Sequence, residues 1–283
     1  MEILILGAGG MAGHLMSIYL QEKGHNVVGF SRKPLDYCEN IIGDALQKDV
    51  IKEAVTYKKF DVVINCLGVL NKNVDNNISE GIFINSYLPH YIVDCLSKTD
   101  TKFIHLSTDC VFSGKDGEYN EDSFKDSDTL YGRTKSLGEI NDLKNLTIRT
   151  SIIGPDMKEE GVGLLNWFLK QNGPVKGFNS VIWTGVSTIT LAQAIEAAIE
   201  QNITGLYNLV NNQKISKYEL LNLFNNYIKR EKIEIIKDDT IHCNKSLINN
   251  RKDFNFVVPS YEEMILDTSR WIVDHKELYK HYF

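Results

Sequence analysis

The chain has 283 residues and a formal net charge of -6, with 43% apolar and 24% charged residues. Such a composition is ordinary for a globular protein, and the length suits one large α/β domain or a nucleotide-binding domain with a smaller lobe. The negative charge argues against nucleic acid as a main partner. No apolar run approaches the roughly 20 residues of a membrane span. The five cysteines are scattered, without a CxxC pair, and no cluster of histidines or carboxylates has metal-ligand spacing. We therefore expect reduced thiols, a cytoplasmic location and no metal site.

The first half of the chain alternates segments typical of strands with segments typical of helices. Residues 62–64 are apolar on both faces, as in a central parallel strand. This alternation predicts an α/β fold with a Rossmann-type doubly wound parallel sheet and right-handed crossovers. The expected strands are 2–6, 26–30, 61–65, 102–106 and 146–150, and the expected helices are 11–23, 45–57, 79–97 and 130–143.

After about residue 150 the pattern loosens. Residues 163–171, 190–201 and 217–229 have helical spacing, with short strands between them. We expect residues 1–155 to form the Rossmann domain, with contributions from later segments. Residues 156–283 should form mainly a smaller, interwoven substrate lobe.

A glycine-rich segment follows the first strand and opens the first helix. Gly7, Gly10 and Gly13 give the pattern GxxGxxG, and Gly9 and Met11 lie within it. Small residues let the backbone turn tightly and approach a pyrophosphate, and the aligned amides of the helix N-terminus favour an anion. The segment predicts a dinucleotide site; the alternative is a glycine-rich turn without a ligand.

The end of the second strand predicts which dinucleotide binds. Sites for NAD usually carry an acid there, whereas this chain has Ser31, Arg32 and Lys33. Two bases and a hydroxyl suit a 2′-phosphate, so we predict NADP(H); the alternative is that both bases are solvated loop charges. Asp44 stands where an acid commonly accepts from the adenine amino group, or it caps a helix.

A catalytic constellation follows the strand 102–106. Thr108 stands at the strand end, and Tyr131 and Lys135 lie four residues apart on the next helix, so they share one face. A nearby ammonium would lower the pKa of the tyrosine from about 10 towards neutral pH. The tyrosine could then donate a proton to a carbonyl oxygen that receives hydride, while Thr108 binds the same oxygen.

Three segments, 107–114 (STDCVFSG), 131–139 (YGRTKSLGE) and 146–154 (LTIRTSIIG), resemble the dTDP-4-dehydrorhamnose reductases among the extended short-chain dehydrogenases. The resemblance implies that Thr108, Tyr131 and Lys135 form the catalytic triad. It implies a nucleotide-sugar substrate, linked to UDP or dTDP, and a possible homodimer. The resemblance places Asn65, Cys66, Leu67 and Gly68 along the cofactor and Asp109, Asn85, Trp183 and Arg251 near the substrate. In that family Asn85 often has a structural role near the site.

The chain departs from this family at Cys110, where a tyrosine is usual, and at Ile152, where a tryptophan is usual. A cysteine at this position resembles the bifunctional UDP-4-keto-6-deoxyglucose 3,5-epimerase/4-reductases, which pair it with a later lysine. Lys176 is the best match for that lysine. The resemblance therefore implies conversion of UDP-4-keto-6-deoxy-D-glucose to UDP-L-rhamnose, with the thiol and the amine exchanging protons beside the keto group.

Several alternatives stay open. Trp183 could be a core residue, and Arg251 could form a surface ion pair. Cys110 could be a small buried residue beside the site, and Lys176 a surface lysine. His105 has no assigned role. The protein could be a 4-ketoreductase without epimerase activity, or a non-catalytic NADP-binding regulatory subunit, although the intact triad argues against the latter.

Overall fold

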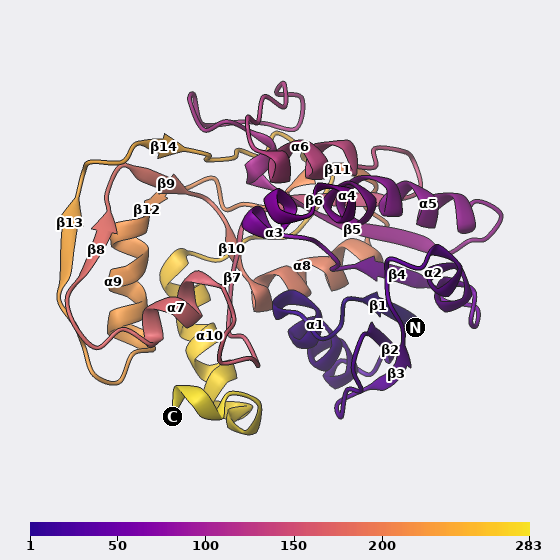
Figure 1. Cartoon of the computed structure of the whole chain (residues 1–283), viewed down its shortest axis with the longest axis horizontal. Helices are drawn as coiled ribbons and strands as arrows, with labels where there is room; N and C mark the ends of the chain where they lie inside the picture. Colours follow the sequence, from indigo (N-terminus) through magenta and orange to yellow (C-terminus); the bar gives the residue numbers. More distant parts are fainter.

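A seven-stranded parallel sheet forms the centre of the molecule in the computed structural model, which describes residues 1–283. The strand order is β11-β6-β5-β4-β1-β2-β3, and every pair is parallel (Figure 1). The chain winds outward from β1 in both directions, which confirms the doubly wound sheet. The strands are β1 Glu2–Leu6, β2 Asn26–Ser31, β3 Glu39–Ile42, β4 Val62–Asn65, β5 Lys102–Thr108, β6 Leu146–Thr150 and β11 Gly205–Asn208.

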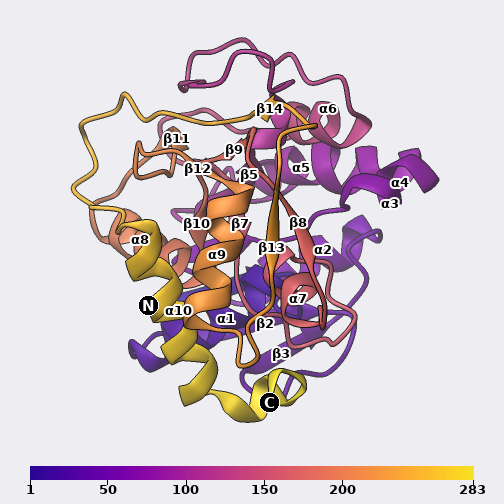
Figure 2. The same cartoon turned by 90° about the vertical axis from the view of Figure 1, so that its left-hand side faces the viewer.

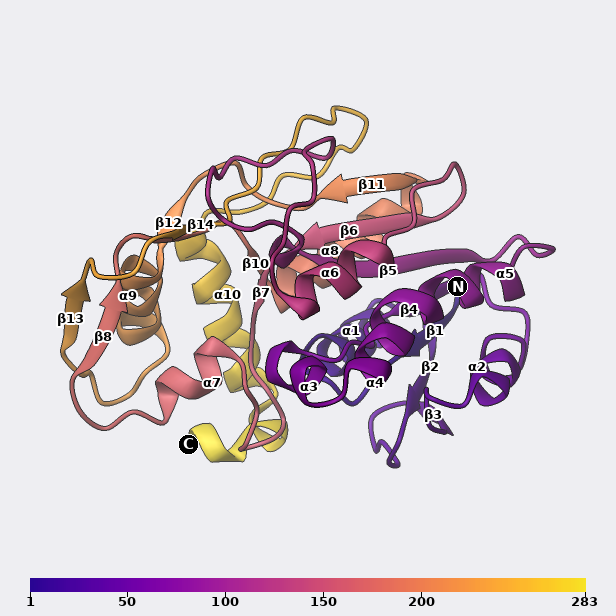
Figure 3. The ribbon, with the colours of Figure 1, turned by 45° about the horizontal axis from the view of Figure 1, so that its top comes forward.

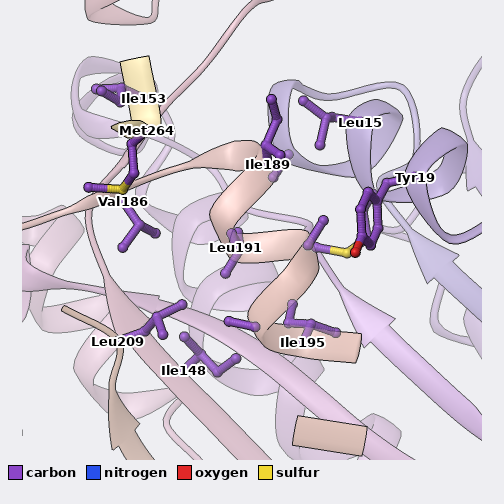
Figure 4. Packing of buried hydrophobic residues seen from close by; sticks show 14 of the residues in the cluster. Leu15, Tyr19, Ile148, Ile153, Val186, Ile189, Leu191, Ile195, Leu209 and Met264 are labelled. Atoms are coloured by element: carbon purple, nitrogen blue, oxygen red, sulfur yellow. The ribbon is translucent and has the colours of Figure 1, made fainter. Parts of the chain in front are cut away.

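Helices cover both faces of this sheet, so its strands are buried on both sides. Successive residues of β1 alternate between two cores: Ile3 and Ile5 pack with α1 (Met11–Glu22) and α8 (Thr188–Glu200), and Leu4 and Leu6 with α2 (Lys48–Val55) and α5 (Leu88–Cys95). Figure 4 shows side chains of α8 facing those of α1 in the larger core. Burial on both faces explains why the strand sequences are continuous apolar runs.

The predicted helix at 79–97 is interrupted. It consists of α4 (Ile78–Ile82), a π-helical turn η1 (Phe83–Tyr87) and α5. The π turn contains Asn85, which is fully buried. The next helix, α6 (Leu130–Leu137), ends earlier than predicted, at Gly138, where a Cβ atom would lie 1.9 Å from the Asn85 carbonyl oxygen. The helix α3 (Asn71–Asn76) was not predicted.

Most residues after β6 form a second lobe, while α8 and β11 return to the main sheet. Figure 2 views the molecule from the side of the lobe, where β8 and β13 pair beside α9. Figure 3 shows the arrowheads of β6 and β11 pointing towards this lobe, so the carboxyl edge of the sheet faces it. None of the helices is long and apolar enough to cross a bilayer. The remaining elements are β7 Ile152–Ile153, α7 Leu164–Leu169, β8 Val175–Phe178, β9 Val181–Trp183, β10 Val186–Ser187, β12 Ile215–Ser216, α9 Lys217–Tyr227, β13 Ile235–Asp238, β14 Cys243–Asn244, α10 Tyr261–Asp274 and the short turns η2 Asp109–Val111, η3 Lys276–Leu278 and η4 Lys280–Tyr282.

Candidate active site

The glycine segment forms a tight turn between β1 and α1. Gly7 has a φ of 82°, in the left-handed region that favours glycine. A Cβ atom on Gly13 would lie 2.2 Å from the Gly7 carbonyl oxygen, so the helix can approach the turn only without a side chain there. Gly10 is the N-cap residue of α1, and no side chain caps the helix there. Met11 opens the helix, and Gly9 has no atom within 3.4 Å of its Cβ position. The loop thus has the form of a cradle for a phosphate at a helix N-terminus.

The end of β2 carries positive charge without an anionic partner. Arg32 and Lys33 are exposed, and neither forms a salt bridge. Ser31 is buried; its hydroxyl donates to the Lys33 carbonyl and accepts from the Asn40 amide at 3.1 Å. These residues fit the 2′-phosphate of NADP, because both guanidinium and ammonium groups are available to it.

Asp44 follows β3 and caps a turn. Its carboxylate accepts from the Leu46 amide at 3.0 Å, and its carbonyl accepts from the Gln47 amide. The helix α2 begins later than predicted, with Gln47 as its N-cap. The alternative of Asp44 as the cap of that helix is therefore wrong.

The end of β4 lies directly against the glycine turn. A Cβ atom on Gly7 would lie 3.1 Å from the backbone of Cys66 and of Leu67, so these two residues lie directly against the glycine turn. Asn85 does not reach out to a ligand: its amide donates to the Val69 carbonyl and the Thr134 hydroxyl and accepts from the Val69 amide. It ties the loop after β4 to α6, which agrees with the structural role that the resemblance implies, whereas a contact of its amide with the substrate is not supported.

Thr108, Tyr131 and Lys135 converge at the carboxyl end of β5. Thr108 accepts from the Cys110 amide at 3.1 Å and donates to Asp109 at 3.1 Å. Burial raises the pKa of Tyr131, and a hydrogen bond with Thr108 opposes this in part. The Lys135 ammonium group is buried and donates to the Leu106 carbonyl at 2.6 Å. Burial lowers the pKa of Lys135 to about 8.

These pKa shifts correct one expectation. The sequence predicted that the lysine would lower the pKa of the tyrosine, whereas in the structure the pKa of Tyr131 is raised. The reason is geometric: Nζ of Lys135 turns towards β5, where it meets Leu106 and His105, and Tyr131 is half-buried beside Thr108. In this arrangement Tyr131 holds its proton, as a proton donor must.

Cys110 and Asp109 form the wall of the site towards the lobe. Burial raises the pKa of the Cys110 thiol to about 12, and burial also raises the pKa of Asp109. Lys217, at the first position of α9, acts electrostatically on both groups, and burial lowers its own pKa to about 8. Its Nζ lies 5.0 Å from the ring centroid of Trp183 and has no hydrogen-bond or ion-pair partner.

Lys176 is not beside Cys110. It lies on β8, its side chain is 69% exposed, and its Nζ is paired with Asp238 at 2.9 Å. The pairing of β8 with β13 holds it at the side of the lobe that lies away from the main sheet (Figure 1). The structure thus does not support the expected partnership; Lys217 and Lys245 are the lysines that act electrostatically on Asp109 and Cys110. The sequence alone gave one clue to Lys217: the capping box of Ser216 and Glu219 marks a helix start.

Trp183 and Arg251 follow the alternatives that the sequence left open, a core residue and an ion pair, since Arg251 pairs with Asp253. Trp183 is buried in the main core, in agreement with the core alternative, although its ring faces Lys217 and its Nε1 has no hydrogen-bond partner. Arg251 donates to the carbonyls of Thr204 and Leu206, at the amino end of β11. Ligands bind at the carboxyl edge of such sheets, so Arg251 lies at the wrong edge to meet a diphosphate.

Residues 1–243 match the protein family described as RmlD substrate binding domain. The dTDP-4-dehydrorhamnose reductase of Mycolicibacterium smegmatis is 30% identical over 141 residues, which are 49% of this chain and 40% of that protein. The methionine adenosyltransferase 2 subunit beta of Xenopus laevis is 26% identical over 236 residues, 77% of this chain and 69% of that protein.

The solved dTDP-4-dehydrorhamnose reductase of Bacillus anthracis, in complex with NADP, has a TM-score of 0.80 at 19% identity and covers 94% of this chain and 98% of that one. At this identity the likeness shows the fold. The chain spans about half the length of the first curated relatives it matches, with 51%, 40% and 48% covered.

Proposed function

Because this chain belongs to the RmlD substrate-binding domain family, we propose that it is an NADP(H)-dependent reductase of the keto group of a nucleotide-linked 6-deoxy-4-ketohexose. The observation that carries the proposal is the position of Thr108, Tyr131 and Lys135 at the carboxyl end of β5, beside the glycine turn. The similarity to the dTDP-4-dehydrorhamnose reductases of Mycolicibacterium smegmatis and Bacillus anthracis supports it.

The cofactor would be held by the glycine turn, with its 2′-phosphate at Arg32 and Lys33, and would supply hydride to the keto carbon. Tyr131 donates its phenolic proton to the carbonyl oxygen, and the Thr108 hydroxyl binds the same oxygen. General acid catalysis of this kind accelerates a reaction by about 10²- to 10⁴-fold. The cleft between the carboxyl edge of the sheet and the lobe would hold the sugar nucleotide, with Lys217 as the cation that the lobe contributes.

The test is the oxidation of NADPH with dTDP- and UDP-linked 4-keto-6-deoxyglucose and with their 3,5-epimerised forms. Turnover that is lost in Tyr131→Phe, with NADPH binding retained, is the expected result. No turnover with any of the four sugars would contradict the proposal.

The finer proposal is that the protein also epimerises carbons 3 and 5 before reduction, giving UDP-L-rhamnose from UDP-4-keto-6-deoxy-D-glucose. Both carbons flank the keto group, so their protons are acidified. The raised pKa of Cys110 keeps the thiol protonated, which suits the group that returns a proton. The lowered pKa of Lys217 suits the group that removes one.

Exchange of deuterium from solvent into C3 and C5 without NADPH tests this step. We expect exchange in the wild-type protein and none in Cys110→Ala or Lys217→Met, with Lys176→Met as the matched control that retains it. Exchange that survives Cys110→Ala would leave a 4-reductase without epimerase activity.

A second candidate function is that of a non-catalytic NADP-binding subunit. The Xenopus laevis methionine adenosyltransferase 2 subunit beta favours it, since that alignment spans 77% of this chain. The intact triad argues against it. Binding of NADPH without turnover of any keto-sugar nucleotide would support it. A homodimer and a cytoplasmic location remain predictions.

A further inference from the structure

A chain of hydrogen bonds joins the C-terminal segment to the glycine turn. The indole N–H of Trp271, on α10, donates to the Tyr279 hydroxyl at 3.0 Å. The same hydroxyl lies 2.8 Å from Nε2 of His14, on α1, and Nδ1 of His14 lies 2.9 Å from the Gly10 carbonyl oxygen. His14 and Tyr279 are fully buried, so solvent does not compete for these contacts.

The partners determine the direction of every bond in this chain. A carbonyl oxygen only accepts, so Nδ1 of His14 carries the ring proton and Nε2 has a lone pair. Nε2 therefore accepts from the Tyr279 hydroxyl, whose oxygen in turn accepts from the Trp271 indole, a group that can only donate. Burial lowers the pKa of His14 to about 4, so the ring is neutral at neutral pH, as this arrangement requires.

Carbonyl groups of the glycine turn are held by side chains that lie outside the turn. The Gly10 carbonyl accepts from the backbone amide of His14 at 3.0 Å as well as from its ring, and the Ala8 carbonyl accepts from the Tyr37 hydroxyl at 2.8 Å. The peptide group is planar, so holding the Gly10 carbonyl also aims the Met11 N–H in the opposite direction. Glycine gives its neighbouring peptides unusual freedom to turn. A phosphate at a helix N-terminus is attracted by N–H groups and repelled by carbonyl oxygens, so this orientation matters for binding.

Further contacts fasten the C-terminal segment on either side of Tyr279. Before it, Nε2 of His275 lies 2.8 Å from the carboxylate of Glu22, the last residue of α1. After it, the ring of Tyr282 stacks on that of Tyr279 with centroids 6.0 Å apart, and its hydroxyl accepts from the Asp156 backbone amide at 2.9 Å. The Tyr279 hydroxyl is therefore held firmly against α1.

We propose that His14 and Tyr279 are positioning residues of the cofactor site, which hold the Gly10–Met11 peptide with its N–H turned towards the pyrophosphate of NADP(H). The inference rests on the proposed function for the identity of the cofactor. Both side chains lie behind the turn and act through the Gly10 carbonyl. Tyr279 is 265 residues from His14 in the sequence, so the C-terminal segment contributes to a site that the first helix forms.

The test compares the binding of two ligands by calorimetry: NADPH, and adenosine 2′-monophosphate, which lacks the pyrophosphate. His14→Leu removes the side-chain donor to the Gly10 carbonyl, and Tyr279→Phe removes the hydroxyl that fixes the imidazole tautomer. We expect each variant to bind NADPH about tenfold or more weakly, the loss of one charge-assisted bond to a phosphate. Both should bind adenosine 2′-monophosphate as the wild type does, because its phosphate is expected at Arg32 and Lys33.

His14→Asn and Glu22→Gln are the matched controls. An asparagine at position 14 can place its amide nitrogen where Nδ1 stands, so it keeps a donor for the Gly10 carbonyl. His14→Asn should therefore bind NADPH more tightly than His14→Leu. Glu22→Gln weakens the contact with His275 at the far end of α1 and should leave the affinity for both ligands unchanged.

Unchanged NADPH affinity in folded His14→Leu or Tyr279→Phe overturns the proposal. An equal loss of affinity for both ligands also overturns it, since a purely structural role would not discriminate between them. If both variants unfold, NMR of the ring nitrogens of wild-type His14 decides: a protonated Nδ1 supports the proposal, and a protonated Nε2 refutes it. Wild-type protein that binds neither ligand contradicts the proposed cofactor itself, so the two failures can be told apart.

Discussion

Replacing Glu139 by Gln tests whether a buried ion pair secures the catalytic helix. Glu139 and Arg149 have side-chain exposures of 2% and 0%, and two parallel bonds of 2.9 and 2.8 Å join them. The Glu139 carboxylate also accepts from Ser107 at 2.7 Å and from Lys125 at 3.0 Å. Glu139→Gln keeps the shape but leaves the Arg149 charge buried and unpaired, which costs about 3–5 kcal/mol.

Urea denaturation followed by circular dichroism measures this loss as a change in the free energy of unfolding. Glu277→Gln is the matched control: Glu277 is 73% exposed and pairs with Lys280 at 2.9 Å, so its loss should leave the midpoint unchanged. The double variant Glu139→Leu, Arg149→Met removes both charges and should be more stable than Glu139→Gln. A loss below about 1 kcal/mol in Glu139→Gln would refute the reasoning, since surface pairs already reach that value.

The stability loss caused by Glu139→Gln should depend on pH in a definite direction. The pKa of Glu139 lies below its ordinary value of 4.5, with Arg149 as the main lowering cause. A carboxyl whose folded pKa is depressed adds stability that is fully present above the unfolded pKa. The difference in the free energy of unfolding between wild type and Glu139→Gln should therefore be largest at neutral pH. It should shrink as the pH falls through the pKa of Glu139 in the folded state, because a protonated Glu139 leaves the Arg149 charge equally unpaired.

Three further predictions concern ligand binding and turnover. Gly13→Ala should abolish NADPH binding measured by calorimetry, because the added Cβ would lie 2.2 Å from the Gly7 carbonyl oxygen. Tight binding by this variant would contradict the proposal that the glycine turn holds the cofactor phosphates. The double variant Arg32→Ala, Lys33→Ala should weaken NADPH about tenfold or more and leave NADH unchanged, as expected for lost charge-assisted phosphate bonds of about 1.5–3 kcal/mol. Lys217→Met should raise KM for the keto-sugar nucleotide, whereas Lys176→Met should not; equal effects would remove Lys217 from the site.

Five of the seven strands of the main sheet could be predicted because their apolar patterns are local. Apolar runs such as Val62–Ile64 are buried on both faces, and the glycine turn and the Tyr131–Lys135 spacing depend on neighbours a few residues away. The residues of the triad could therefore be predicted without knowledge of tertiary contacts. The π turn at Asn85 could not be predicted, because its cause is a contact with α6, far along the chain.

The residues that were not predicted, or were placed wrongly, have positions that depend on contacts between segments far apart in the sequence. Lys217, at the start of α9, acts electrostatically on Asp109 and Cys110 although it is more than 100 residues away in the sequence, and no spacing in the sequence encodes this. Lys176 was chosen by resemblance, but the parallel pairing of β8 with β13 fixes it to Asp238. Arg251 was misplaced for a similar reason: the loop that carries it returns to the amino end of β11.

Two polar pairs dock α6 on β5, and together they connect stability with catalysis. His105 and Ser107 are two residues apart on one strand, so their side chains share a face of the sheet. Lys135 lies in the last turn of α6, and Glu139 directly follows its C-cap residue, Gly138. His105 meets Lys135, and Ser107 meets Glu139. Any shift of the helix along the strand would break both pairs and displace Nζ of Lys135 from the Leu106 carbonyl. Glu139→Gln should therefore lower kcat as well as stability, even under conditions where the variant is fully folded, and unchanged kcat in the folded variant would separate the ion pair from the chemistry.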